Sequence, residues 1–185
     1  MSKKKLGILV GSLRRDSYSK KVAQYLSGLL EEQFDVSFPD ISILTMFNED
    51  LDNGANIPEE WTQFRNEVKS LDAVLFVTPE YNRSVPAVLK NALDVASRPS
   101  GKSVWGGKPG AVVSISPGKI GGFGANNHLR QVTTCLNIYI MQTPETYIGG
   151  IADAVDSEGI SDMSVQDFLL KFATAFTKWV DKFAF

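Results

Sequence analysis

The chain has 185 residues, of which 43% are hydrophobic and 22% are charged, and its formal net charge is −2. This length suits one domain whose hydrophobic core needs no disulfide or metal to hold it together, so we expect residues 1–185 to form a single domain. A charge this close to neutral offers no basic surface for nucleic acid or for an anionic membrane.

The single cysteine and the single histidine limit the chemistry further. Cys135 cannot form an internal disulfide, and with His128 alone no His/Cys metal cluster can be built. No apolar run approaches the roughly 20 residues that a membrane span needs, and residues 6–10 are too short for a signal peptide. We therefore expect a cytoplasmic protein. Cys135 is expected to be an inert core thiol, and His128 a residue on a helix surface or at an interface.

Short apolar runs alternate with segments of helical spacing along the chain. We expect strands at residues 6–10, 36–41, 73–77, 110–115 and 138–141, and helices at residues 17–30, 58–69, 86–96, 123–136 and 165–183. Parallel strands need crossover connections, so the alternation predicts a doubly wound α/β domain with helices on both faces of a parallel sheet. Five strands in a domain of this size favour the flavodoxin-like order 2-1-3-4-5, which places a ligand between the first and third strands.

The loop of residues 11–19, GSLRRDSYS, follows the first expected strand and opens the first helix. A helix N-terminus has unpaired N–H groups and a partial positive charge, which favour a phosphate. Serine hydroxyls and Arg14 add further donors. The loop has neither the Lys-Ser/Thr ending of a P-loop nor G-x-G-x-x-G, so Mg-triphosphate and a dinucleotide are not expected here. Capping of the helix by Ser17 or Asp16 is a structural reading compatible with phosphate binding.

Two more loops follow the third and fourth expected strands. Residues 78–85 form a proline-stiffened turn beside Tyr81, which suits a flat hydrogen-bonding heterocycle, although an ordinary strand-to-helix connection fits the spacing equally well. Residues 114–124 are rich in glycine, which allows backbone to approach a ligand closely or simply makes a flexible turn. Because the carboxyl ends of parallel strands meet at one edge, the three loops together predict a site for a mononucleotide with a planar head, such as a flavin.

Three segments resemble the NADPH-dependent FMN reductases, a flavodoxin-like family that includes quinone, chromate and azo-dye reductases. They are GSLRRDSYSKKVA (11–23), TPEYNRSVPAVLKNALD (78–94) and the glycine-rich loop 116–124, which is followed by HLRQ (128–131). They occur in the family's order and spacing, and the second is highly specific to it. The resemblance covers most of the chain.

The resemblance implies an FMN site made by all three loops. Its implied residues are Gly11, Ser12, Arg14, Ser17 and Ser19 at the phosphate, Pro79, Glu80, Tyr81, Asn82 and Arg83 along the isoalloxazine ring, and Ser116 and Gly118 at the ring's other edge. Pro117 and Lys119 in the third loop are not the residues most common in the family, and the family commonly has Asn where this chain has Ser19. A serine is shorter and donates only once, so we expect slightly weaker phosphate binding.

The implied function is that of an FMN-dependent NAD(P)H oxidoreductase without an obligatory catalytic side chain or a metal, because the flavin carries the chemistry. The hypothesis is a ping-pong cycle: NADPH or NADH passes a hydride to flavin N5, and a quinone, azo, nitro, chromate or flavin acceptor then takes the electrons. A flavodoxin-type electron carrier and a redox-sensing flavin-binding module without NAD(P)H turnover are the alternatives. The family also implies a homodimer or homotetramer.

The roles of Arg83 and of the loop 45–57 each allow alternative interpretations. Arg83 either contacts the phosphates of the incoming NAD(P)H or forms an ion pair across a subunit interface. The polar loop 45–57, with Phe47 and Asn48, lies either at a subunit boundary or pocket rim, or is a simple exposed connection.

Overall fold

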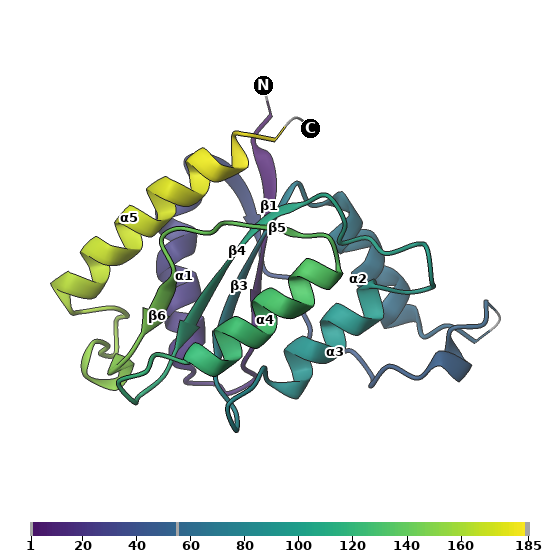
Figure 1. Ribbon diagram of the computed structural model, residues 1–185, viewed down its shortest axis with the longest axis horizontal. Coiled ribbons are helices and arrows are strands. Elements are labelled where there is room, and N and C mark those ends of the chain that lie inside the picture. Colours follow the sequence, from purple (N-terminus) through teal and green to yellow (C-terminus); the bar gives the residue numbers. More distant parts are fainter. Residues whose placement is uncertain (1, 55, 184–185) are drawn as a thin grey trace.

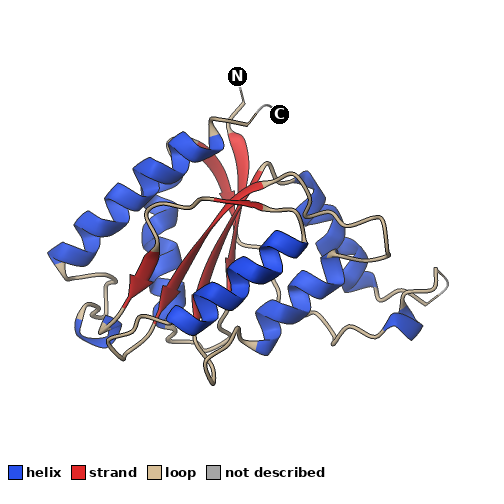
Figure 2. Ribbon diagram, in the orientation of Figure 1, coloured by secondary structure: helices blue, strands red, loops and turns tan. Residues whose placement is uncertain are grey.

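The computed structural model describes residues 2–54 and 56–183, which form one β-sheet between two layers of helices (Figures 1 and 2). The strands in this part of the chain are β1 (Lys4–Val10), β2 (Phe34–Ser37), β3 (Ala73–Pro79), β4 (Pro109–Ile115), β5 (Tyr139–Ile140) and β6 (Thr146–Ile148). The helices are α1 (Tyr18–Leu30), α2 (Glu59–Ser70), α3 (Ala87–Ala96), α4 (Phe123–Cys135) and α5 (Met163–Val180), with 3₁₀ turns η1 (Glu49–Leu51) and η2 (Ile151–Asp153).

The strands pair in the order β2-β1-β3-β4-β5, and every pair is parallel. This confirms the flavodoxin-like α/β fold expected from the alternation of strands and helices. The apolar side chains of the central strands enter two cores: α1 and α5 cover one face, while α2, α3 and α4 cover the other (Figure 1). The carboxyl ends of β1, β3 and β4 therefore lie together at one edge of the sheet, at the bottom of Figure 1.

The fifth position of the sheet is divided between two short strands. β5 pairs with the start of β4 at Pro109 and Gly110, and β6 pairs with the end of β4 from Val113 to Ile115. The predicted strand at residues 138–141 corresponds to β5, and β6 is an addition. Three residues show too little alternation to be separated from a loop by pattern alone.

The second strand also differs from its prediction. We expected it at residues 36–41, but β2 ends at Ser37, because Pro39 has no N–H to donate to a ladder. The register between β1 and β2 stops at the Gly7–Ser37 pair, whereas β1 continues to Val10. The end of β1 is therefore not covered by β2.

The other elements agree with their predictions to within a few residues. Pro58 and Pro86 are N-cap residues of α2 and α3 rather than their first helical residues. The prediction for Cys135 was wrong, because this residue is exposed in the last turn of α4. Thr133, two residues earlier, faces the core, so Cys135 lies on the opposite side of the helix. No helix in the described ranges is both long and apolar enough to cross a bilayer.

Candidate functional site

The three loops after β1, β3 and β4 meet around a cavity of 210 Å³ at the carboxyl edge of the sheet. The residues that line it are Ser12, Arg14, Ser17, Tyr18, Ser19, Pro79, Glu80, Tyr81, Ile115, Ser116, Pro117 and Ile151. All the residues predicted for the site are among them except Gly11, Asn82, Arg83 and Gly118. Segments far apart in the sequence thus converge on one small space.

One end of the cavity is a polar cage around the start of α1. Ser17 is the N-cap residue, and its Oγ accepts a hydrogen bond from the Lys20 N–H at 3.4 Å, so the predicted capping is confirmed. Ser12, Ser17 and Ser19 are buried, and the first turn of α1 carries no acidic side chain. The partial positive charge of this helix end therefore has no acidic side chain in its own first turn to neutralise it.

Ser19 is the most informative residue of this cage. It is 1% exposed, and its Oγ has no hydrogen-bond partner among the described residues. Leaving a buried hydroxyl unpaired costs roughly 1–3 kcal/mol, so such groups normally have a partner. A hydroxyl and free helix N–H groups beside a cavity are the donor set that a phosphate needs. The residues present therefore fit the phosphate of a flavin nucleotide.

Gly11 does not line the cavity but sets the distance between the first two loops. Its N–H donates to the Val77 carbonyl at 2.8 Å, which ties the end of β1 to β3. A Cβ on Gly11 would lie 2.8 Å from Thr78 Oγ1, closer than real Cβ atoms approach. A glycine here allows the first loop to pack directly against the second.

The second loop is a tight turn closed by two backbone hydrogen bonds between Tyr81 and Ser84, at 3.0 and 2.9 Å. Its tip consists of Asn82 and Arg83, whose φ angles of 50° and 66° are in the left-handed region. Both tip residues are exposed and lie outside the cavity. Arg83 forms its ion pair within the chain, with Glu80 Oε1 at 3.4 Å.

Glu80 connects the second loop to α4. Its Oε2 accepts a hydrogen bond from the Ala125 N–H at 3.0 Å, at a helix end where Gly122, the N-cap residue, has no side chain. Gly124 makes this approach possible, because a Cβ there would lie 2.6 Å from the Arg83 carbonyl oxygen and 2.9 Å from Glu80 Oε2. The loop after β3 is thus fixed against the helix that follows β4.

A buried polar network stabilises the third loop. Ser114 Oγ donates to the Gly121 carbonyl at 2.8 Å, and Asn126 Nδ2 donates to Ser114 Oγ at 3.1 Å. Nearer the cavity, Ser116 Oγ accepts from the Gly118 N–H at 2.9 Å. Gly118 itself lies outside the cavity and shapes the turn that presents Ser116.

Other candidate residues lie away from the cavity. His128 is exposed on α4, as expected, with its Nδ1 3.0 Å from Ser84 Oγ. In the loop 45–57, of which Ala55 lies outside the described residues, Phe47 stacks on Trp61 at 5.3 Å and its N–H donates to Asn91 Oδ1. That loop packs against α2 and α3 and does not form the rim of this cavity.

Four residues line the cavity without having been among the predicted site residues: Tyr18, Ile115, Pro117 and Ile151. Ile151 is positioned by β6, the strand that was not predicted, and by the turn at Gly149 and Gly150 that follows it. The run TYIGGI at residues 146–151 carried a faint signal, since β-branched and aromatic residues before a glycine pair are typical of a strand that ends in a turn.

Comparison with known proteins agrees with this geometry. A sequence model described as NADPH-dependent FMN reductase matches residues 4–153. A quinone reductase of Pseudomonas putida is 50% identical over 175 residues, covering 95% of this chain and 94% of that protein. A 2-hydroxy-1,4-benzoquinone reductase of a Burkholderia species is 44% identical, covering 95% of this chain and 96% of that protein.

A solved structure gives the same result. The flavoenzyme FerB, an NAD(P)H:(acceptor) oxidoreductase from Paracoccus denitrificans, superposes with a TM-score of 0.90 at 38% identity, covering 97% of this chain and 98% of that one. With the family model spanning most of the chain, the identification is direct: this protein belongs to the NADPH-dependent FMN reductase family.

Proposed function

We propose that this protein is an FMN-dependent NAD(P)H oxidoreductase that reduces quinones. The observation that carries the proposal is the unpaired, buried Ser19 hydroxyl in a cage at the start of α1, next to two loops that enclose a cavity. The family match and the 50% identity to a quinone reductase support the same class of reaction.

The chain's own residues supply binding and orientation. Ser12, Ser17 and Ser19, with the N–H groups at the start of α1, would hold the FMN phosphate, and Arg14 would add a positive charge. The loops at residues 79–83 and 116–118 would lie along the ring through Pro79, Glu80, Tyr81 and Ser116, which line the cavity. FMN, when bound, supplies the hydride-accepting and electron-donating chemistry.

The cavity is small. Its 210 Å³ is below the 300–1,000 Å³ typical of ligand pockets, so a mononucleotide would be enclosed only in part. Tyr81 on the rim is 50% exposed. With an accessible rim, NADPH or NADH can bind first and an acceptor can bind after the oxidised donor has left, as a ping-pong cycle requires. Neither His128 nor Cys135 lines the cavity, which supports a site without a catalytic side chain.

An open face also allows more than one acceptor. Quinones come first because the relatives at 50% and 44% identity carry quinone reductase names. Azo and nitro compounds, chromate and free flavin are further acceptors for the same face. We also propose a homodimer or homotetramer, since Leu13, Tyr81, Ile120 and Phe123 leave large apolar surfaces exposed on the three loops and the start of α4.

The test is to mix the FMN-loaded protein anaerobically with NADPH, and in parallel with NADH, and to follow the visible flavin absorbance. Rapid bleaching by at least one donor, followed by recovery of the band when a benzoquinone is added, is expected. A flavin that stays oxidised with both donors contradicts the proposal. The protein would then be a flavodoxin-type electron carrier or a flavin-binding module without NAD(P)H turnover.

A further inference from the structure

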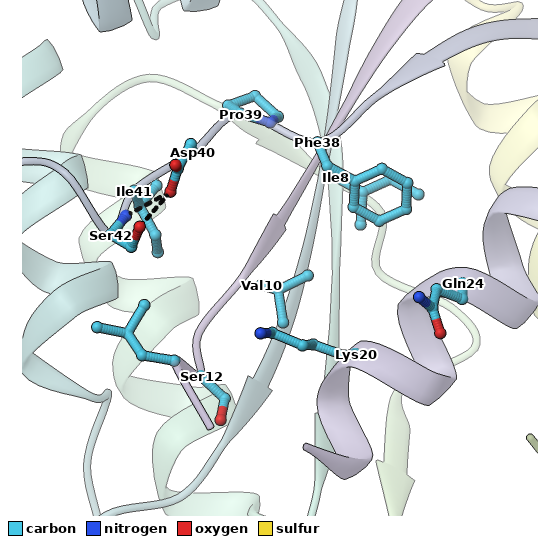
Figure 3. A pocket seen from close by; sticks show the side chains of 11 residues that line it. Ile8, Val10, Ser12, Lys20, Gln24, Phe38, Pro39, Asp40, Ile41 and Ser42 are labelled. Atoms are coloured by element: carbon cyan, nitrogen blue, oxygen red, sulfur yellow. Dashed lines mark hydrogen bonds between the residues drawn. The ribbon is translucent and has the colours of Figure 1, made fainter. Parts of the chain in front are cut away.

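A second cavity opens directly beside the phosphate end of the site. It has a volume of 490 Å³ and lies between α1 and residues 38–42, over the end of β1 that β2 leaves uncovered (Figure 3). We call it the β1 groove; it is lined by Ile8, Val10, Ser12, Leu13, Lys20, Gln24, Phe38, Pro39, Asp40, Ile41 and Ser42. Ser12 lines both cavities, so the groove begins where the polar cage ends.

The walls of the β1 groove are mostly apolar. Ile8 and Val10 form its floor from β1, and Phe38, Pro39 and Ile41 come from the segment that departs from the sheet after β2 (Figure 3). Phe38 is 45% exposed, so its ring is accessible to a ligand in the groove. An exposed ring beside aliphatic side chains offers a flat surface on which a planar heterocycle can stack.

The polar groups of the β1 groove are arranged along its length. Lys20 extends from α1 toward Val10 and Ser12 (Figure 3), and its ammonium has no hydrogen bond or ion pair with the described residues. Gln24 lies four residues further along the same face of α1. Asp40 is the one carboxylate of the wall, and its Oδ1 accepts from the Ser42 N–H at 2.8 Å and from Ser42 Oγ at 2.6 Å.

We propose that the β1 groove holds the adenosine 5′-phosphate half of FAD, so that the protein binds FAD as well as FMN. The inference rests on the proposed function, because it places the riboflavin phosphate in the cage at the start of α1. The second phosphate then meets the Lys20 ammonium next to Ser12, and the adenine reaches the apolar walls at Phe38 and Pro39. A volume of 490 Å³ is in the range of nucleotide-sized pockets.

The continuity of the two cavities favours FAD over a separate nucleotide. A ligand that leaves the cage through its phosphate enters the groove at Ser12, and in FAD the two phosphates are directly joined. The adenine end of NAD(P)H has similar chemistry, and the experiment separates the two sources.

The experiment compares FMN and FAD binding to cofactor-free protein by equilibrium dialysis. Gln24→Trp fills the β1 groove from an exposed helix position away from the cage, and Glu32→Trp adds the same side chain on an exposed turn as a control. We expect the wild type and Glu32→Trp to bind both flavins. Gln24→Trp should lose about tenfold or more in affinity for FAD while its affinity for FMN stays the same. Phe38→Ala, also at an exposed position, should weaken FAD selectively in the same direction.

Each other outcome is decisive. Binding of FMN with no binding of FAD, or equal FAD affinity in the wild type and both groove variants, overturns the inference and leaves the proposed function intact. If the groove variants raise the KM for NADH or NADPH of the FMN-loaded protein and leave FAD affinity unchanged, the groove belongs to the hydride donor and the inference is wrong. Failure of both flavins to bind contradicts the proposed function itself.

Discussion

Glu80, in the loop after β3, accepts a hydrogen bond through Oε2 from the backbone N–H of Ala125, in the first turn of α4, at 3.0 Å. The two residues are 45 positions apart, and the N-cap position of the helix is a glycine without a side chain. A carboxylate at a helix N-terminus satisfies an unpaired N–H and interacts favourably with the helix dipole. Glu80 thereby fixes two of the three loops of the proposed FMN site relative to each other.

Removing this contact should destabilise the fold. Glu80→Ala is expected to lower the free energy of unfolding by about 1 kcal/mol, the usual cost of losing a helix cap. Glu80→Gln should cost less, because the amide oxygen still accepts a hydrogen bond. Thermal unfolding of the cofactor-free protein measures both. Glu32→Ala, on an exposed turn, is the matched control, and an effect as large as that of Glu80→Ala would show that the contact is unimportant.

Gly124 and Gly28 make a matched pair of helix glycines. A Cβ on Gly124 would lie 2.6 Å from the Arg83 carbonyl oxygen, whereas a Cβ on Gly28 would have no neighbour within 4 Å. Gly124→Ala should therefore push the loop after β3 away from α4, at a cost of about 1–3 kcal/mol, and weaken FMN binding. Gly28→Ala, inside α1, should stabilise the protein by about 0.5–1 kcal/mol. Chemical denaturation of both variants checks this, and equal signs would refute the steric argument.

Ser19 and Ser17 should respond differently to alanine substitution. The Ser19 hydroxyl has no partner in the described part of the chain, so Ser19→Ala should leave the cofactor-free protein as stable as before or slightly more so. Its FMN affinity should fall by about tenfold, through loss of one hydrogen bond to a charged group. Ser17→Ala should lose about 1 kcal/mol even without FMN, because Ser17 caps α1. Melting curves with and without FMN separate the two roles; identical behaviour of the two variants would contradict them.

Glu67 provides a pH-dependent prediction. Partial burial, with the nearby Asp40 carboxylate as a second cause, raises the pKa of Glu67 above its ordinary value of 4.5. A carboxyl with a raised folded-state pKa favours the fold while protonated, and this contribution is lost as the pH rises through the raised value. Glu67→Gln should therefore stabilise the protein at about pH 7, by about 0.5 kcal/mol or less because solvent still reaches the partly buried group, and have no effect near about pH 3. A difference of equal size at both pH values would contradict this origin.

The fold was predictable because its central elements carry strong local patterns. Residues 73–77 are uniformly apolar and become the buried core of β3, and the helical spacing within residues 17–30 becomes the apolar face of α1. The edges of the sheet were less predictable. β2 and β6 are short strands whose extent depends on their pairing with β1 and β4, and pairing partners are distant in sequence.

Only those parts of the site that depend on side-chain type or on a sequence motif could be predicted. Serines before a helix indicated the proposed phosphate end of the site, and the motif around Tyr81 indicated the proposed ring end. The hydrogen bond from Glu80 to the start of α4 could not be predicted from the sequence. Its donor is the backbone N–H of Ala125, which any residue except proline would supply. The β1 groove was missed for a similar reason, since it exists only because Pro39 takes the chain away from β1 beyond Ser37.

The most direct test of the FMN site compares FMN with riboflavin, which has the same ring and ribityl chain but no phosphate. Both are titrated into the cofactor-free protein while flavin fluorescence is followed. If the cage of Ser12, Ser17 and Ser19 holds a phosphate, FMN should saturate the protein with an affinity at least about 100-fold higher than that of riboflavin, because several charge-assisted hydrogen bonds are involved. Equal affinities for the two flavins, or no saturation with FMN, would contradict the account.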